Sequence, residues 1–243
     1  MKKRAISIVL FFLSLDMIKA VVFDLDNTLL DFMQMKEQAV KSAIQGMIEA
    51  GMDIDPKISR DRIFEIYEEK GWEYQEVFDH FIQEEVGELN YKFLASGIVA
   101  YRKAKEASLI LYPSVKNTLI SLMKSGLKLG VVSDAPSREA WMRICYVNLH
   151  HIFDEVVTFD DTKKRKPAPE PFERIIALLD VPAENILMVG DWPERDVFGA
   201  KEVGMKTAFA KYGDSFGVVE SGADYDLDDL SQLIEIIQNE NEK

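Results

Sequence analysis

The segment VVFDLDNTLLD, residues 21–31, ends an apolar run with two carboxylates separated by one leucine. Residues two apart in extended backbone point to the same side, so Asp24 and Asp26 are expected to face one site. A carboxylate can attack phosphorus and form an aspartyl phosphate. A second carboxyl group can protonate the leaving oxygen and later take a proton from the attacking water. The alternative is a turn or a helix cap, where Asp, Asn and Thr are favoured without any chemistry.

Two further segments carry groups that suit a phosphate. Ser133 and Asp134 follow the apolar run GVV, and a hydroxyl beside backbone N–H groups suits a phosphate oxygen. The same pair before a proline can simply cap the next helix. Lys166 opens the segment KPAP, where a fixed lysine can neutralise both a phosphate and a nucleophilic carboxylate. A lone Lys-Pro pair is nearly uninformative by itself.

The last acidic segment is GDWPERD, residues 190–196, which follows the apolar run ILMV. Carboxylate oxygens, together with a phosphate and waters, suit octahedral Mg²⁺. The metal ion would shield the repulsion between Asp24 and an incoming phosphate dianion. A helix cap with an acidic first turn is the alternative, and it explains Asp196 better than Asp191.

The elements that must position these residues alternate along the chain. Apolar runs predict five strands, and the segments between and after them predict helices. The predicted strands are 18–23, 127–133, 154–159, 185–191 and 205–210, and the predicted helices are 113–126, 136–148, 169–179, 193–203 and 228–238. Apolar strands alternating with helices indicate a parallel sheet covered on both faces. Ligands bind such sheets beyond the carboxyl ends of the strands, where these polar segments lie.

Residues 33–109 lack strand-like alternation and show helical spacing of apolar residues, with a break near Gly71. We therefore predict an all-helical domain at 33–109, inserted into an α/β core made of residues 17–32 and 110–243. One segment of the insertion is rich in polar aromatic residues. It contains Trp72, Tyr74, Phe78 and His80, and we interpret it as the interior of the insertion rather than as a substrate site.

Composition narrows the classes of function. The 243 residues are 47% hydrophobic with a net charge of −13, which excludes wholesale disorder and argues against nucleic acid or anionic membrane as a partner. Cys145 is the single cysteine, so no intrachain disulfide can form, which favours a reducing, cytoplasmic setting. We expect Cys145 to lie in the core. Residues 1–16 resemble a secretory signal without a small-residue cleavage site, and we interpret them as an N-terminal extension of uncertain status or the result of an upstream start codon.

The joint order of the motifs resembles the haloacid dehalogenase-like (HAD) superfamily. D-x-D-x-T, a Ser at a strand end, K-P and G-D-x-x-x-x-D follow one another between about Ile18 and Gly213. The resemblance implies an α/β fold with a Rossmann-like parallel sheet core, helices on both faces and an inserted helical cap. Carried over by position, it implies Asp24 as nucleophile and Asp26 as general acid/base. It also implies that Ser133, Asp134 and Lys166 bind the phosphate.

The same resemblance implies Mg²⁺ as the cofactor. Its ligands would be Asp24, Asp191 and the backbone carbonyl of Asp26. Thr28 matches a position that supports the loop, and Asp196 one that orients Lys166 or a water on the metal. Family members that dehalogenate acids lack the second aspartate of the first motif, so Asp26 favours phosphate chemistry.

The function expected is a Mg²⁺-dependent phosphomonoesterase that hydrolyses a small phosphorylated metabolite through an aspartyl phosphate, as a monomer or homodimer. The segments DLDNTLLDF, GIVAYRKAK and GMKTAFAKYG are similar to archaeal family members described as glyceraldehyde-3-phosphate phosphatases, while Trp192 departs from the residues frequent there. A phosphomutase of the β-phosphoglucomutase type is the main alternative. A haloacid dehalogenase and a non-enzymatic binding module are further alternatives.

Overall fold

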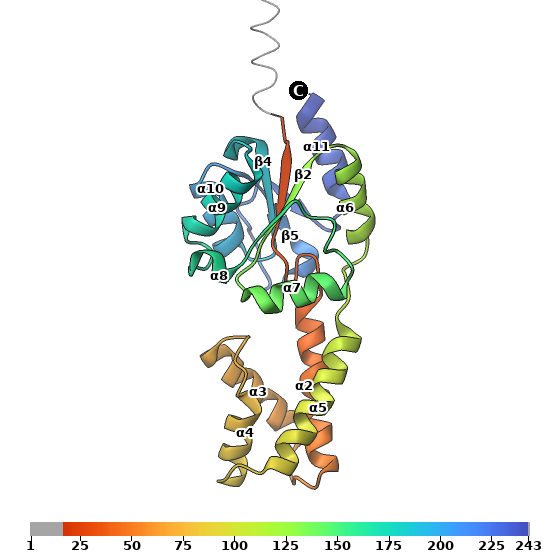
Figure 1. Ribbon diagram of the computed structural model, residues 1–243, viewed down its shortest axis with the longest axis vertical. Coiled ribbons are helices and arrows are strands. Elements are labelled where there is room, and N and C mark those ends of the chain that lie inside the picture. The colour runs from red at the N-terminus through yellow and green to blue at the C-terminus, as the bar shows by residue number, and fades with distance from the viewer. Residues whose placement is uncertain (1–16, 243) are drawn as a thin grey trace, which may run out of the picture. The chain divides into compact units, whose positions relative to one another are not determined.

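The computed structural model describes residues 17–242, and they form two compact units (Figure 1). One unit combines the residues up to Asp31 with those from Leu111 onward, and the other comprises Phe32–Ile110. Each unit has its own apolar core. The interpretation of residues 1–16 falls outside the described residues.

A six-stranded parallel sheet forms the centre of the first unit, in the order β3-β2-β1-β4-β5-β6. The strands are β1 (Ala20–Phe23), β2 (Lys128–Val132), β3 (Glu155–Val157), β4 (Ile186–Gly190), β5 (Lys206–Ala210) and β6 (Tyr225–Leu227). Parallel strands need crossover connections, and the helices supply them. The predicted Rossmann-like α/β core is confirmed.

Helices cover both faces of this sheet, with α9 and α10 on one face and α6 and α11 on the other (Figure 1). The helices of this unit are α6 (Val115–Lys124), α7 (Ser137–Tyr146), α8 (Phe159–Thr162), α9 (Pro169–Leu179), α10 (Phe198–Glu202) and α11 (Gln232–Glu242). All four residues of β1 are buried, as expected for a strand with helices on both sides. Ala20 and Val22 pack with Phe172 and Ile175 of α9.

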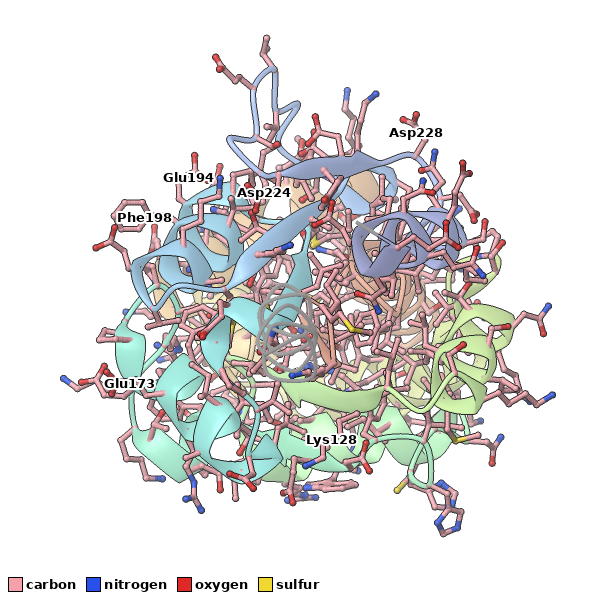
Figure 2. All side chains as sticks on the ribbon, turned by 90° about the horizontal axis from the view of Figure 1, so that it is seen from above. Lys128, Glu173, Glu194, Phe198, Asp224 and Asp228 are labelled. Carbon is pink, nitrogen blue, oxygen red and sulfur yellow. The ribbon has the colours of Figure 1, made fainter. Side chains whose placement is uncertain are left out.

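Charged side chains surround this packed interior. Figure 2 shows Glu173, Glu194 and Asp228 at the periphery of the molecule and directed outward. These carboxylates remain hydrated, so they contribute to the net charge of −13 without a burial cost.

The structure departs from the predicted elements in several places. Strand β6 and the short helix α8 were not predicted, and α11 starts at Gln232 rather than near 228. The predicted helix 193–203 is a π-helical turn, Pro193–Val197, followed by α10. The expectation that Cys145 lies in the core is wrong, because Cys145 is exposed on α7.

The second unit, Phe32–Ile110, consists of four helices. They are α2 (Phe32–Glu49), α3 (Pro56–Lys70), α4 (Val77–Val86) and α5 (Tyr91–Ser108). Asp55 caps α3 by accepting bonds from the N–H groups of Lys57 and Ile58, both at 2.9 Å. Helices α2 and α5 pack closely at Gly97, where a Cβ would overlap the Met47 side chain. None of the helices within residues 17–242 is long and apolar enough to span a membrane.

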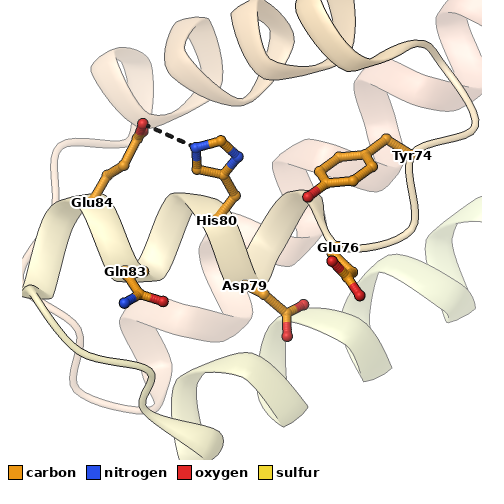
Figure 3. Close-up of a pocket in the computed structure, with 6 residues that line it drawn as sticks. All are labelled: Tyr74, Glu76, Asp79, His80, Gln83 and Glu84. Carbon is orange, nitrogen blue, oxygen red and sulfur yellow. Dashed lines mark ion pairs between the residues drawn. The ribbon is translucent and has the colours of Figure 1, made fainter.

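The polar aromatic segment of this unit divides between core and surface. Phe78 is buried, and Trp72 stacks on Tyr67 with ring centroids 5.9 Å apart. His80 instead lies 3.2 Å from Glu84 (Figure 3). The two line a surface pocket of about 410 Å³ together with Tyr74, Glu76, Asp79 and Gln83.

Candidate active site

The sheet topology brings three of the predicted site segments to one edge. Strand β1 lies between β2 and β4, and Phe23 pairs with Val131 on one side and Val189 on the other. The Asp24 N–H donates to the Val189 carbonyl at 2.8 Å, which continues the ladder one residue past the strand. Asp24, Ser133 and Asp191 therefore leave the sheet side by side. This edge is the switch point at which such folds bind ligands.

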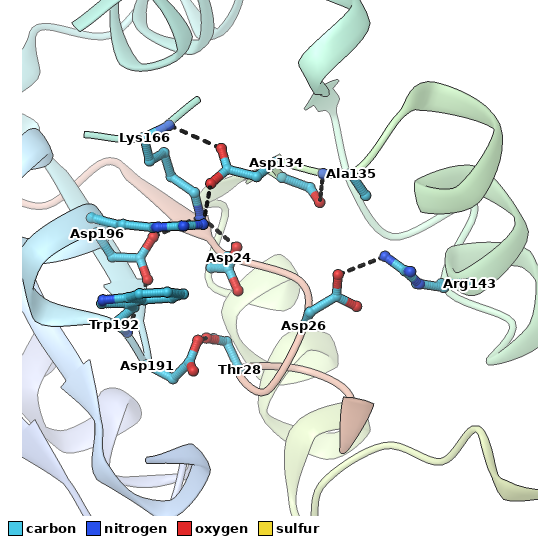
Figure 4. A network of polar contacts seen from close by, with 12 residues as sticks. Asp24, Asp26, Thr28, Asp134, Ala135, Arg143, Lys166, Asp191, Trp192 and Asp196 are labelled. Atoms are coloured by element: carbon cyan, nitrogen blue, oxygen red, sulfur yellow. Dashed lines mark hydrogen bonds and ion pairs between the residues drawn. The ribbon is translucent and has the colours of Figure 1, made fainter. Parts of the chain in front are cut away.

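Three carboxylates converge at this edge (Figure 4). Asp24, Asp191 and Asp196 each offer one oxygen, and these oxygens all lie within 4.8 Å of one another. The side chains come from the end of β1, the end of β4 and the π-helical turn that follows β4. All three residues are buried, at 7% exposure or less. Hard oxygen donors at this separation can hold a divalent cation such as Mg²⁺.

Lys166 is the cation that the structure places among these acids. Its Nζ pairs with Asp24 Oδ1 and lies 2.6 Å from Asp196 Oδ1, and only 4% of the residue is exposed. A buried lysine is tolerated when it is paired in this way. Lys166 thus joins the predicted nucleophile to Asp196.

Burial dominates the electrostatics of the cluster. The pKa of Asp24 is raised to about 7, mainly because burial desolvates its carboxylate. The positive charge of Lys166 lowers this pKa, and the negative charge of Asp196 raises it further. Desolvation and the neighbouring Asp24 likewise raise the pKa of Asp191 well above its usual range. Burial lowers the pKa of Lys166, but the charges of Asp196 and Asp24 outweigh it and raise that pKa overall. Ionising all three carboxyl groups would therefore place more negative charge in the site than Lys166 alone balances.

Local backbone geometry aims Asp196 at the site. It sits in the π-helical turn, where its N–H donates to the Trp192 carbonyl at 2.7 Å and its Oδ2 accepts from the Trp192 N–H at 3.1 Å. A Cβ at Gly190 would overlap the Asp196 carboxyl group, so only glycine fits there. Single π turns inside helices are frequent at functional sites.

The loop after β1 is held from two directions. Thr28 is fully buried and donates through Oγ1 to Asp191 Oδ1 at 3.3 Å, while its carbonyl accepts from the Tyr212 hydroxyl at 2.7 Å. Asn27 adopts a left-handed conformation with φ of 60°. A Cβ at Gly213 would overlap the Asn27 carbonyl, so the loop can pack against this backbone only because residue 213 is glycine.

The segment after β2 lies beside Lys166. The Ser133 hydroxyl accepts from the Ala135 N–H at 3.2 Å, and Asp134 Oδ1 accepts from the Lys166 N–H at 2.9 Å. Asp134 Oδ2 lies 3.2 Å from Nη1 of Arg195. The Asp134 carboxylate therefore fixes Lys166 and Arg195, and a phosphate contact from residue 134 would have to come from its backbone N–H.

Comparison with known proteins decides the family. The family model for haloacid dehalogenase-like hydrolases matches residues 21–210. The chain belongs to the haloacid dehalogenase-like hydrolase family. It is 34% identical over 227 residues to the glyceraldehyde 3-phosphate phosphatase of Pyrococcus furiosus, covering 92% of this chain and 95% of that protein. The predicted family is confirmed.

Solved structures of HAD proteins share the fold. A HAD phosphatase from Thermococcus onnurineus has a TM-score of 0.67 and 27% identity, covering 90% of this chain and 98% of the other. A 2-haloacid dehalogenase from Pseudomonas syringae has a TM-score of 0.61 at 22% identity, covering 92% and 99%. The second similarity concerns the fold alone, because one fold hosts several chemistries.

Arg143, which contacts Asp26 in this HAD site, was not predicted from the sequence. Asp26 is directed away from Lys166, and its Oδ2 accepts from Nη1 of Arg143 at 2.6 Å (Figure 4). Arg143 lies on the buried face of α7 with Ala140 and Ile144. An arginine at a helical position otherwise occupied by apolar core residues is the signal that could have identified it. Tyr212 and Arg195 were also missed, and their sequence context carries no such signal.

Proposed function

We propose that this HAD hydrolase is a Mg²⁺-dependent phosphomonoesterase that acts on a small phosphorylated metabolite through an Asp24 phosphoaspartate. The observation that carries the proposal is the convergence of Asp24, Asp191 and Asp196, whose oxygens lie within 4.8 Å of one another, with the buried amine of Lys166 paired to Asp24 and Asp196. Two acids from opposite halves of the chain meet there because β1 and β4 are neighbours.

The residues present suit a divalent cation. Three buried carboxylates lie together, and Lys166 pairs with two of them, Asp24 and Asp196. Ionising all three leaves an excess of negative charge that a doubly charged ion would balance. We propose that Asp24, Asp191 and the backbone carbonyl of Asp26 hold Mg²⁺, with Asp196 kept on Lys166. The ion would supply the positive charge that lets a phosphate dianion approach a carboxylate.

In the first step, a carboxylate oxygen of Asp24 attacks phosphorus while the bond from phosphorus to the substrate oxygen breaks. Asp26 donates its proton to that leaving oxygen, so an alcohol departs. Lys166 and the Ser133 hydroxyl bind phosphate oxygens, together with N–H groups of the segment after β2. The products of this step are the alcohol and the Asp24 phosphoaspartate.

In the second step, a water oxygen attacks the phosphorus of the phosphoaspartate, and the bond from phosphorus to Asp24 breaks. Asp26, ionised after the first step, takes the proton from the attacking water. The step returns both carboxyl groups to their starting states and releases inorganic phosphate. Thr28 keeps Asp191 in place throughout, as its bond to Asp191 Oδ1 suggests.

A triose phosphate is the substrate class that relatives support best. The Pyrococcus furiosus protein is named for glyceraldehyde 3-phosphate, and this chain spans 95% of its length. The assignment of residues 33–109 as a cap stays a prediction. We further propose a cytoplasmic enzyme, supported by its single cysteine, that acts as a monomer or homodimer without nucleic acid or membrane as a partner.

The test is release of inorganic phosphate from a panel of triose phosphates, phosphoglycolate and sugar phosphates, with Mg²⁺ and then with excess EDTA. We expect turnover of at least one substrate with Mg²⁺ and its loss in EDTA. Full activity in EDTA, or no phosphate release from any substrate, would refute the proposal. Conversion of β-glucose 1-phosphate to the 6-phosphate without phosphate release would instead identify a phosphomutase.

A further inference from the structure

The two carboxylates of the first motif have different partners. Asp24 is bound by Lys166 within the acidic cluster, whereas Asp26 is bound by Arg143 of α7. The Arg143 Nη1 to Asp26 Oδ2 distance is 2.6 Å, which is typical of a short, charge-assisted hydrogen bond. This contact joins residues 117 positions apart, so only the folded core unit creates it.

The Arg143 side chain is buried in the core unit. Only 2% of the residue is exposed, and its helix neighbours Ala140 and Ile144 are fully buried. The Asp26 side chain keeps 23% of its surface exposed, which leaves it accessible to a reacting group. The pair therefore joins a fixed cation inside the unit to a partly exposed carboxylate at the sheet edge.

The position of α7 adds a second link. This helix starts at Ser137, four residues after Ser133, and the segment between them contains Asp134, which accepts from the Lys166 N–H. One stretch of chain thus carries the proposed phosphate-binding hydroxyl, the residue that fixes Lys166 and the arginine bound to Asp26. Displacement of α7 would disturb all three together.

We propose that Arg143 is a positioning residue for proton transfer: it holds the Asp26 carboxyl group in the place from which it serves the leaving oxygen and then the attacking water. The proposal rests on the proposed function, because it requires Asp26 to be the general acid/base. A proton transfer group works only within hydrogen-bond reach of the reacting oxygen, so loss of its anchor lowers the rate without removing the nucleophile.

The test exploits the leaving group. p-Nitrophenolate departs without a proton, whereas an alkoxide needs one from the general acid. We expect Arg143→Met to lower kcat for an alkyl phosphate roughly 10–100-fold, within the range of general acid catalysis, and kcat for p-nitrophenyl phosphate about threefold or less. Arg143→Lys should restore part of the alkyl phosphate activity. Arg138→Met, an exposed arginine of the same helix, is the matched control and should behave as the parent protein.

A double mutant separates positioning from general damage. If Arg143 acts only through Asp26, then adding Arg143→Met to Asp26→Asn should produce no further loss of kcat. Equal loss on both substrates, or a further loss in the Asp26→Asn background, would overturn the proposal.

A structural measurement is independent of whether this chain hydrolyses phosphate esters. Crystal structures of the parent protein and of Arg143→Met are compared at the Asp26 side chain. We expect Asp26 to change rotamer or to become disordered in the variant. An unmoved Asp26 overturns the positioning role, whereas a moved Asp26 in a protein inactive on every phosphate ester refutes only the proposed function.

Discussion

The sheet edge of the core unit and the surface pocket of the helical unit are both acidic, yet they differ in how their charges are held. At the sheet edge, Asp24, Asp191 and Asp196 come from three separate segments and are buried, with Lys166 paired to Asp24 and Asp196. In the pocket, the charged residues come from one short stretch around α4. Glu84 there pairs with His80 at 3.2 Å and with Arg62 at 2.7 Å, with about a third of each side chain exposed.

Burial, rather than the number of acids, distinguishes the proposed active site from the surface pocket. Water solvates the pocket charges, so each ion pair there contributes little to stability. At the sheet edge, desolvation shifts proton affinities and leaves a charge imbalance that a cation would correct.

The largest effect is expected from removing the proposed nucleophile. Asp24→Asn should lower kcat on p-nitrophenyl phosphate by at least about 10³-fold, because it removes the carboxylate proposed to form the covalent intermediate. Glu84→Gln in the pocket should change kcat less than about twofold. Circular dichroism checks that both variants fold. An Asp24→Asn variant with more than a tenth of the parent activity would rule out the phosphoaspartate.

The next effect concerns stability. Lys166→Met should reduce the free energy of unfolding by about 3–5 kcal/mol at neutral pH, because it leaves the buried carboxylates of Asp24 and Asp196 without their paired cation. Arg62→Met, which breaks the Glu84 pair of the helical unit, should cost about 0–1 kcal/mol. Urea unfolding in EDTA compares the two variants. Similar losses would mean that the buried ion pairs of the sheet edge contribute no more to stability than the exposed ion pairs of the pocket.

The pH dependence of metal binding is the third test. Burial raises the pKa of Asp24 to about 7 from its ordinary 3.8. Between these values the folded protein retains a proton that the unfolded chain has lost, so stability without metal falls as pH rises through this window. Mg²⁺ favours the ionised carboxylates and opposes that fall.

Saturating Mg²⁺ should therefore raise Tm more at about pH 8 than at about pH 5, by about 2–4 °C for each kcal/mol of extra stabilisation. Thermal unfolding followed by circular dichroism measures the shift. Asp191→Asn should abolish the difference between the two pH values, while Glu84→Gln should preserve it. A Mg²⁺ shift that is equal at both pH values would contradict the proposed link between burial and metal binding.

Much of the proposed site at the sheet edge was predictable from the sequence. The central strands are continuous apolar runs, and Asp24, Ser133 and Asp191 stand where those runs end. Polar residues at strand ends are conspicuous because the strands themselves are fully buried. Strand β6, by contrast, has the sequence Tyr-Asp-Leu, and only its leucine is buried. It therefore lacks the apolar run from which a strand could be predicted.

The pairing of the charges could not be predicted in the same way. The period of residues 193–203 fits a regular helix, and nothing in it indicates the π turn that aims Asp196 at Lys166. The partner of Asp26 lies 117 residues away on α7, beyond the reach of local patterns. Sequence thus locates the groups proposed to do chemistry, while tertiary packing decides which cation each one contacts.

The smallest effect is expected from removing the hydrogen bond between Thr28 and Asp191. This change should affect Mg²⁺ binding as well as stability. Thr28→Val keeps the shape of a fully buried side chain and removes its bond to Asp191 Oδ1, so it should cost about 1 kcal/mol of stability. Ser96→Ala removes a comparable bond in the helical unit, from Ser96 Oγ to the Gly46 carbonyl at 2.7 Å, with a similar expected cost. Only Thr28→Val should weaken Mg²⁺ binding, because only Thr28 orients a proposed ligand. Calorimetric titration with Mg²⁺ distinguishes them, and an equal affinity in both variants would mean that Thr28 supports the loop without acting on the metal site.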